Sequence, residues 1–184
     1  MSSILISTSR LLLREYSVDD FEGVHEYAKD KETVQFMTWG PNTLEDTVSF
    51  IQSTIVQRSI QPRVHYHFVV ALQENLQIIG GCGIHITRPE HRTAEIGYCF
   101  NKLFWGQGYA TETAGALLKI GFESLNLHRI EATCDTHNFG SARVMEKNGM
   151  RREGHFREHL WQKGEWRDTY LYAILEHEWR EKQE

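Results

Sequence analysis

A short glycine-rich stretch, residues 105–112, has the composition of a site that binds phosphate groups. It contains Gly106 and Gly108, and it leads into a segment of helical periodicity that runs from Gly108 to Leu125. Glycine lets backbone N–H groups approach a ligand closely, and the N-terminus of a helix adds partial positive charge. Because these two features together form a cradle for phosphates, the stretch predicts a ligand that carries pyrophosphate.

Two interpretations of this turn can be made from its own residues and their spacing. In the first, the glycines only permit the geometry of a turn. In the second, Gly106-x-Gly108-x-x-Thr111 is a dinucleotide fingerprint, with Glu131 further along the chain as its acidic partner. Two features disfavour that fingerprint: Thr111 stands where a third small residue is needed, and residues 101–105 separate the turn from the preceding strand. A Walker loop is excluded, since no Gly-Lys-Ser/Thr follows.

The histidines and cysteines do not have the spacing of a metal site. The closest sets are His65-x-His67 and His155-x-x-x-His159, and the second lies in an expected strand, where that spacing does not converge. A nucleophilic role for Cys134 lacks a histidine fixed beside it by the sequence. The sequence therefore predicts no metal ion and no covalent cysteine intermediate.

Amino-acid composition limits the classes of protein to which this chain can belong. The chain has 184 residues, of which 40% are hydrophobic and 24% charged, so we expect one globular domain over residues 1–184 with its core at about 10–179. The net charge of −5 argues against nucleic acid as a partner. Three cysteines in apolar strands indicate reduced thiols. Residues 1–5 lack a signal-peptide pattern and no apolar run reaches membrane length, so we expect a cytoplasmic protein with no membrane contact.

Periodicity predicts the elements that would position these residues. Ser17 and Thr43 are expected to cap the first two helices, and Gly149 to end the fourth. Alternation from Ala94 to Phe100 places Glu95 and Cys99 on one face of a strand. The order βααβββαβαββ predicts an α/β (α+β) domain around a mixed, mainly antiparallel sheet. The expected strands cover 10–14, 67–72, 77–86, 94–100, 129–134, 150–161 and 166–175, and the later helices cover 43–59, 108–125 and 141–148.

The glycine turn resembles the acyl-CoA pyrophosphate loop of the GNAT N-acetyltransferases, whose pattern is Arg/Gln-x-x-Gly-x-Gly/Ala. Trp105 occupies the first position, Gly108 the glycine and Ala110 the final small residue. The run Trp-Gly-x-Gly-Tyr-Ala-Thr-Glu is similar to the Rim-type branch, which acetylates ribosomal-protein N-termini. The resemblance extends from about Arg10 to Trp179. Its further matches are residues 94–98, Asn138-x-x-Ser141, residues 146–150, Gly164, Asp168 and Tyr172.

The resemblance implies a GNAT-type twisted sheet of seven strands with about four helices, whose splayed central strands hold acetyl-CoA as acyl donor. It implies that the strand Tyr98-Cys99-Phe100 pairs with the pantetheine amides in the manner of an added strand, and that Asn138 contacts the pantetheine arm. The expected pyrophosphate-binding residues are Trp105, Gly106, Gln107, Gly108, Tyr109, Ala110 and Thr111.

Acetyl transfer to an amine needs a base, a polarised thioester carbonyl and a proton for the departing thiolate. The resemblance makes Glu95 the base, directly or through water; the other interpretation is a structural carboxylate. Glu158 and Asp168 are the alternates, although Asp168 could equally hold Arg167 or a backbone amide.

Ser141 is the expected proton donor to the thiolate. Many family members use a tyrosine four residues further on, where this chain has Met145, and methionine cannot donate a proton. The other interpretation is that Ser141 only caps its helix.

The acceptor is expected to enter between the first two helices and the closing hairpin, with acetyl-CoA on the opposite side. Trp39 would be either a wall of this cleft or a core anchor. The resemblance favours a protein N-terminal amine, such as that of a ribosomal protein. A polyamine, amino acid or antibiotic stays open as acceptor, and so does a non-catalytic acyl-CoA-binding or sensing module. Trp161 and Trp166 fit a homodimer interface or a monomer core equally well.

Overall fold

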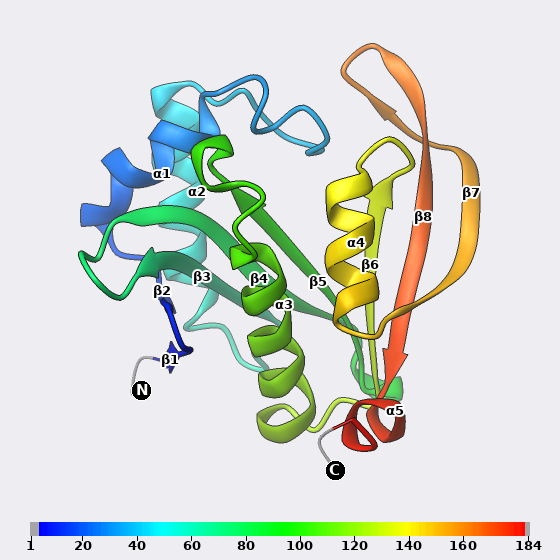
Figure 1. Ribbon diagram of the computed structural model, residues 1–184. Helices are drawn as coiled ribbons and strands as arrows, with labels where there is room; N and C mark the ends of the chain where they lie inside the picture. The colour runs from blue at the N-terminus through cyan, green and yellow to red at the C-terminus, as the bar shows by residue number, and fades with distance from the viewer. Residues whose placement is uncertain (1–3, 183–184) are drawn as a thin grey trace.

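An eight-stranded sheet runs through the part of the chain that the computed structural model describes, residues 4–182 (Figure 1). Met1 to Ser3, part of the stretch tested above for a signal peptide, lie outside the described residues. The strands are β1 (Leu5–Ser7), β2 (Leu11–Glu15), β3 (His65–Leu72), β4 (Ile78–Arg88), β5 (Thr93–Phe100), β6 (Arg129–Asp135), β7 (Arg151–Gln162) and β8 (Glu165–Leu175). Their spatial order is β1-β2-β3-β4-β5-β6-β8-β7. The mixed, mainly antiparallel sheet is confirmed, because β5–β6 is the parallel pair among antiparallel ones. The expected number of strands was one too few, since β1 was not foreseen.

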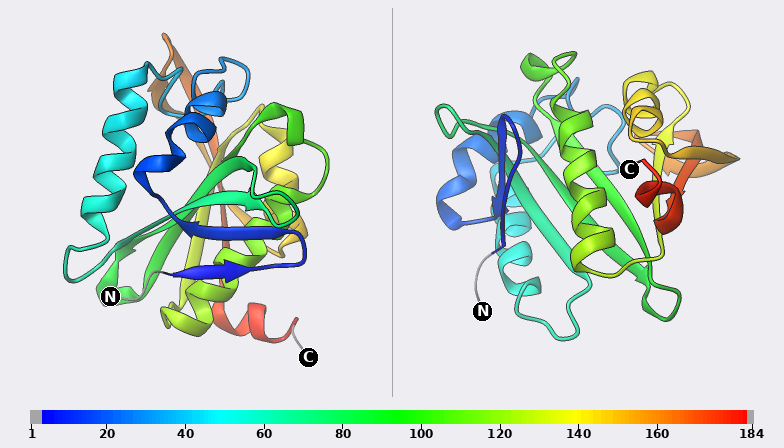
Figure 2. Two further views of the ribbon diagram at one scale, coloured as in Figure 1. Left: turned by 90° about the vertical axis from the view of Figure 1, so that its left-hand side faces the viewer. Right: turned by 60° about the horizontal axis from the view of Figure 1, so that its bottom comes forward.

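Helices cover both faces of the sheet (Figure 2). They are α1 (Phe21–Ala28), α2 (Leu44–Gln57), α3 (Tyr109–Lys119), α4 (Phe139–Lys147) and α5 (Glu176–Arg180). The side of α1 and α2 has a small core built around Tyr16, Tyr27 and Ile51. The opposite side, beneath α3 and α4, has the main core, which includes Leu117, Ile130 and many other apolar residues. No helix within residues 4–182 has the length and apolar character needed to cross a membrane.

The helix boundaries follow local signals that the sequence carries. Thr43 pairs with Asp46 in a capping box at the start of α2, as predicted. Ser17, expected as a cap, forms a capping box with Asp20 at the 3-10 turn Val18–Asp20 that leads into α1. Gly149 follows α4 with φ +81°, the left-handed conformation that glycine adopts without strain. The helix expected over 108–125 is α-helical only to Lys119 and continues as a π-turn to Ser124.

The feature that positions the site is the separation of β5 from β6. The two strands pair only over residues 93–95 and 129–131, and beyond that they diverge (Figure 1). On its other side β5 stays paired with β4 as far as Phe100. Residues 96–100 of β5 therefore present a free backbone edge to the space between the diverging strands, as an added strand would require.

Candidate active site

A cleft of about 1490 Å³ occupies the space between the diverging strands. Sites for single small ligands usually measure about 300–1,000 Å³. The larger volume leaves room for an extended ligand together with a second molecule. Its walls come from the loop between α1 and α2, from β4, β5 and β6, from the N-terminal ends of α3 and α4, and from the hairpin of β7 and β8.

The glycine turn forms one end of this cleft. Gly106 and Gly108 have φ of +74° and +85°, so both require the left-handed region that glycine tolerates. Gly108 is the N-cap of α3 and supplies no capping side chain, which leaves the first N–H groups of the helix available to a ligand. Trp105 lies at the cleft wall and donates from Nε1 to the Phe100 carbonyl, at 2.7 Å.

The predicted pyrophosphate residues are brought together with one exception. Gln107 is not among the residues that line the cleft, and its side-chain amide donates to the Leu103 carbonyl at 3.2 Å. The residues of the turn that line the cleft are Trp105, Gly106, Gly108, Tyr109, Ala110 and Thr111.

Glu112 braces the turn from outside the cleft lining, through hydrogen bonds that were not predicted from the sequence. Its carboxylate accepts hydrogen bonds from Thr8 Oγ1 (2.6 Å), Ser9 Oγ (2.9 Å), and the Arg10 backbone N–H (2.9 Å) and Nε (2.7 Å). Arg10 also donates to the Gln107 carbonyl at 3.0 Å. Burial acts to raise the pKa of Glu112, but the hydrogen bonds from Thr8 and Arg10 outweigh it and hold that pKa below its usual range.

Removing this brace is expected to weaken acetyl-CoA binding without touching a lining residue. A Glu112→Ala variant should bind acetyl-CoA about 3- to 10-fold more weakly and lose about 1–3 kcal/mol of stability, because it leaves several donors without their acceptor. Calorimetric titration and thermal unfolding measure the two effects. Glu123→Ala, an exposed carboxylate further along the same helical segment, is the matched control. Equal affinities for the two variants would contradict the brace.

Glu95 lines the cleft at the point where β5 and β6 begin to diverge. It is the last residue of β5 that pairs with β6, and its carboxylate lines the cleft. Its Oε1 accepts a hydrogen bond from Thr133 Oγ1 at 3.2 Å. Alternation puts it on the same face of β5 as Gly97 and Cys99, as predicted. The position lets a carboxylate face the cleft from the side of α1 and α2.

The two alternate carboxylates lie outside the cleft lining. Asp168 accepts from the backbone N–H of Glu158 at 2.8 Å and contacts His155 Nε2 at 2.7 Å. These two contacts lower the pKa of Asp168, the backbone N–H having the larger effect. The interpretation of Asp168 as the holder of a backbone amide is confirmed. Glu158 is exposed in an irregular part of β7.

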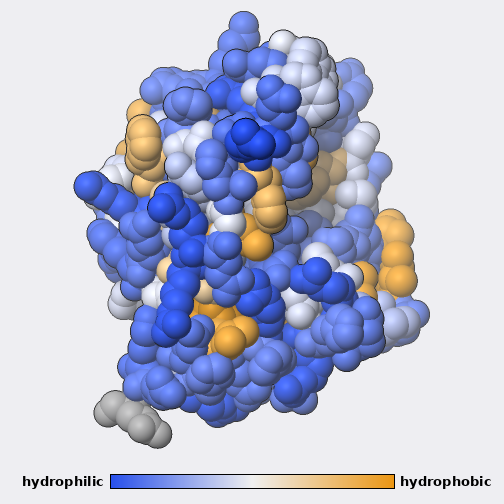
Figure 3. All heavy atoms as spheres, turned by 90° about the vertical axis from the view of Figure 1, so that its right-hand side faces the viewer, coloured by the Kyte–Doolittle hydropathy of each residue, from blue (hydrophilic) through white to orange (hydrophobic). Residues whose placement is uncertain are grey.

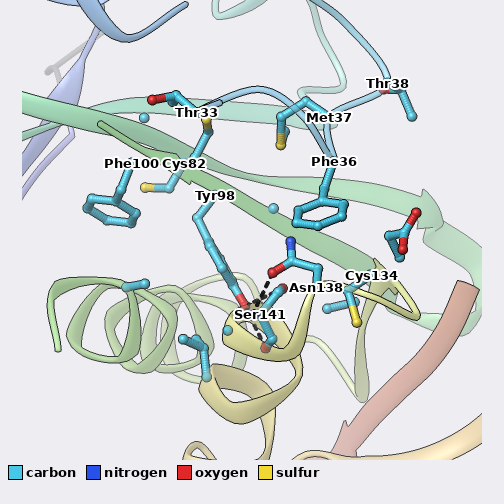
Figure 4. A pocket seen from close by; sticks show the side chains of 18 of the residues that line it. Thr33, Phe36, Met37, Thr38, Cys82, Tyr98, Phe100, Cys134, Asn138 and Ser141 are labelled. Carbon is cyan, nitrogen blue, oxygen red and sulfur yellow. Dashed lines mark hydrogen bonds between the residues drawn. The ribbon is translucent and has the colours of Figure 1, made fainter. Parts of the chain in front are cut away.

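Ser141 occupies the first turn of α4, but it is not the cap. Asn138 is the N-cap, and its Oδ1 accepts from the Ser141 backbone N–H at 3.0 Å. The capping interpretation of Ser141 is therefore wrong, because α4 starts earlier than the expected Ser141. The hydroxyl of Ser141 lies 3.0 Å from that of Tyr98, and both side chains line the cleft (Figure 4). Met145 is fully buried in the main core and does not line the cleft.

The side chain of Tyr98 is a site feature that the sequence analysis did not identify. Its strand was expected to act through backbone groups, and alternation only placed Tyr98 on the strand face opposite to that of Glu95 and Cys99. The contact with Ser141 joins residues 43 positions apart. The periodicity of a sequence cannot predict such a contact, because the contact depends on how α4 packs against β5.

The cysteines and histidines have other environments. All three cysteines are free and buried, and burial raises the pKa of Cys99 to about 12 and that of Cys134 to about 11. Thiols with such pKa values are poor nucleophiles at neutral pH. His159 contacts Thr169 Oγ1 at 2.7 Å. Within residues 4–182, no group of three or more His, Cys, Asp or Glu side chains is arranged to hold a metal ion.

A further part of the cleft wall is apolar, and it is linked by a hydrogen bond to the hairpin of β7 and β8. Phe36, Met37 and Trp39 line it from the loop between α1 and α2. Trp39 is 36% exposed, so it is a wall of the cleft rather than a core anchor. The hairpin of β7 and β8 reaches this loop, where Gln162 Nε2 donates to the Met37 carbonyl at 2.6 Å.

The outer face of the hairpin is mainly hydrophilic, with separate apolar side chains (Figure 3). Trp161 and Trp166 are 62% and 56% exposed. Their rings are arranged edge to face, with the ring centroids 5.4 Å apart. Neither tryptophan belongs to the core, so the core interpretation of these two residues is wrong.

Residues 10–151 match the Acetyltransferase (GNAT) domain family. The chain belongs to the GNAT family. The GNAT chain is 41% identical to an uncharacterised N-acetyltransferase, YnaD, from Bacillus subtilis (strain 168), over 95% of its own length and 98% of that protein. It is likewise 41% identical to a GNAT acetyltransferase from Bacillus anthracis of known crystal structure, which superimposes with a TM-score of 0.86 and covers 95% of this chain and 99% of the other. This protein is therefore an acetyltransferase, of the family whose acyl donor is acetyl-CoA.

Two more distant structures share the fold of this GNAT protein and contain CoA. One is RimL, a ribosomal L7/L12 alpha-N-protein acetyltransferase in complex with coenzyme A (22% identity, TM-score 0.84, 94% of this chain and 98% of that one). The other is a spermidine N-acetyltransferase from Vibrio cholerae in complex with CoA and spermine (22% identity, TM-score 0.81, 94% and 99%). They acetylate different kinds of amine, so the fold does not select the acceptor.

Proposed function

We propose that this protein transfers the acetyl group of acetyl-CoA to a primary amine by direct attack within a ternary complex. The observation that carries the proposal is that one cleft contains both an anion-binding turn and a carboxylate, at the two ends of the free edge of β5. A thioester laid along that edge would have its phosphates at the turn and its acetyl group toward Glu95.

Each step has a candidate residue. The turn of residues 105–111 holds the pyrophosphate, the edge Tyr98–Phe100 pairs with the pantetheine amides, and Asn138 contacts the pantetheine arm. Glu95 takes the proton of the ammonium, directly or through water, and the neutral amine attacks the thioester carbonyl, which a backbone N–H polarises. Ser141 gives a proton to the departing thiolate.

The first acceptor that we propose is the N-terminal amine of a protein, as for the Rim-type enzyme named above. The spermidine enzyme, at the same 22% identity, supports a small-molecule amine as the second candidate. The presence of both Glu95 and Ser141 in the cleft favours catalysis over a non-catalytic acyl-CoA-binding module. Three free thiols favour a reducing compartment, so we place the enzyme in the cytoplasm.

A thiol-release assay tests the acceptor class. Purified protein and acetyl-CoA are combined with peptides bearing ribosomal N-termini, polyamines, amino acids or aminoglycosides, and free CoA is measured. Turnover with peptides alone supports the first candidate, and turnover with small amines alone supports the second. Saturable acetyl-CoA binding without turnover on any amine would support a binding module. Absence of acetyl-CoA binding would contradict the entire proposal.

Gly97 offers a test of where the acceptor lies. It faces the cleft two residues after Glu95, and a Cβ added there meets nothing within 4 Å, so alanine fits the folded protein. The added methyl would instead occupy ligand space. For Gly97→Ala we expect the KM for the acceptor to rise about 3- to 30-fold, in line with roughly 1–2 kcal/mol for a poorly accommodated methyl group.

The affinity of Gly97→Ala for acetyl-CoA should stay unchanged. Gly154→Ala is the control, because Gly154 lies on β7 outside the cleft and a Cβ there makes ordinary contacts at 3.6 Å. An acceptor KM that is equal in both variants would place the acceptor away from Gly97.

A further inference from the structure

The cleft contains a pair of hydroxyl groups whose geometry goes beyond the roles given so far. The Tyr98 phenol oxygen lies 3.0 Å from Ser141 Oγ and 3.3 Å from the Ser141 carbonyl oxygen (Figure 4). Tyr98 comes from β5 and Ser141 from α4, so the pair joins the two walls between which acetyl-CoA is proposed to lie. The side chain of Tyr98 is partly buried and packs against the main core.

The direction of this hydrogen bond decides what Ser141 can do. A serine hydroxyl has one hydrogen to donate and can accept two hydrogen bonds. If Tyr98 donates to Ser141 Oγ, the serine hydrogen remains free for a third group in the cleft. Of the two oxygens within reach of the phenol hydrogen, Ser141 Oγ (3.0 Å) is the nearer acceptor and the Ser141 carbonyl (3.3 Å) the more distant one. Burial also raises the pKa of Tyr98, so the phenol keeps its hydrogen and remains a donor.

The rest of α4 leaves Ser141 as its only hydroxyl at the cleft. The residues of this helix that line the cleft are Phe139, Gly140, Ser141, Arg143, Val144 and Lys147. Met145 is fully buried and has no proton to give. A single hydroxyl on a short side chain must be held in one rotamer to act reliably, and the Asn138 cap fixes only the backbone of Ser141.

We propose that Tyr98 is a positioning residue, which donates its hydroxyl hydrogen to Ser141 Oγ and so aims the serine hydrogen at the CoA sulfur. This inference rests on the proposed function. In the step, the neutral amine nitrogen bonds to the carbonyl carbon, the carbon–sulfur electron pair leaves on sulfur, and the nitrogen gives its surplus proton to water. The sulfur takes the Ser141 proton and Ser141 regains one from water, so Tyr98 begins and ends as a neutral phenol.

A Tyr98→Phe variant tests the proposal, because it removes the phenol oxygen and keeps the ring in its packing. We expect kcat to fall about 10- to 100-fold, the size of effect that misplacing a reacting group produces. The KM for both substrates and the Kd for acetyl-CoA should stay within about twofold, since the lost group acts on the chemical step. Calorimetric titration and steady-state rates provide these values.

A double mutant distinguishes positioning from a separate role. If Tyr98 acts through Ser141, adding Tyr98→Phe to Ser141→Ala should cause no further loss of kcat. Tyr172→Phe is the matched control, because that buried phenol donates to Glu146 at 3.1 Å outside the cleft. It should lose stability and retain kcat.

Three results would overturn the inference. They are a Tyr98→Phe enzyme with wild-type kcat, losses that multiply in the double mutant, and a Ser141→Ala enzyme that stays active while Tyr98→Phe does not. In each of these cases wild-type turnover persists and only the role of Tyr98 is rejected. If the wild-type protein acetylates no amine at all, the proposed function itself has failed.

Discussion

A Glu95→Gln enzyme is expected to turn over about 10²–10⁴-fold more slowly than the wild-type enzyme, which is the usual contribution of a positioned base. An ammonium ion has no lone pair with which to attack, so its proton must leave first. The carboxylate lines the cleft, while the alternates Asp168 and Glu158 do not. Glutamine keeps the shape and the hydrogen bond from Thr133 but cannot accept the proton. Affinity for acetyl-CoA, measured by calorimetric titration, should therefore be unchanged.

Glu131→Gln provides the control for this change. Glu131 lies opposite Glu95 in the parallel register, but its carboxylate is held by Arg88 (2.8 Å) and Arg129 (2.7 Å) outside the cleft lining. We expect it to lose stability and to retain kcat. A Glu95→Gln enzyme with full turnover would reject Glu95 as the base and would leave the family assignment intact.

Gly108→Val is expected to weaken acetyl-CoA binding about 10- to 100-fold. The residue has φ +85°, and a β-branched side chain there costs about 1–3 kcal/mol of backbone strain. An added Cβ would also approach Arg10 Nη2 to 3.4 Å, next to the brace at Glu112. We expect the turn to relax into another conformation, so that its N–H groups would no longer converge on the proposed pyrophosphate site.

The effect of backbone strain alone on acetyl-CoA affinity must be distinguished from the effect of disrupting the turn. Gly164 has φ +88° in the turn between β7 and β8, so Gly164→Val introduces a similar strain away from the pyrophosphate turn. Its acetyl-CoA affinity should equal that of the wild type, although its stability falls. A folded Gly108→Val protein with wild-type affinity would contradict the phosphate-binding role of the turn.

Elements with strong local signals were predictable from the sequence. The capping boxes at Ser17 and Thr43 are side-chain contacts between residues three apart, and the alternation from Ala94 to Phe100 reports directly on two faces of a strand. Short elements were missed. Strand β1 has three residues and helix α5 has five, too few for a period of 2.0 or 3.6 to emerge.

The site was predictable as a set of positions and not as a network. Glu95, Asn138 and Ser141 come from motifs, and all three line one cleft. The bracing of the turn by Glu112 and the hydroxyl pair of Tyr98 and Ser141 join residues about 100 and 43 positions apart. Such contacts depend on tertiary packing, which leaves no local pattern. The start of α4 was also not predictable from local sequence, because Asn138 and Ser141 are both residue types that cap helices.

The most direct test of the central claim is the pattern of initial rates of CoA release when acetyl-CoA and an accepted amine are varied together. Direct transfer needs both substrates in the cleft at once, so the double-reciprocal lines should intersect. Parallel lines, together with an acetylated protein formed in the absence of amine, would show a covalent intermediate and contradict direct attack.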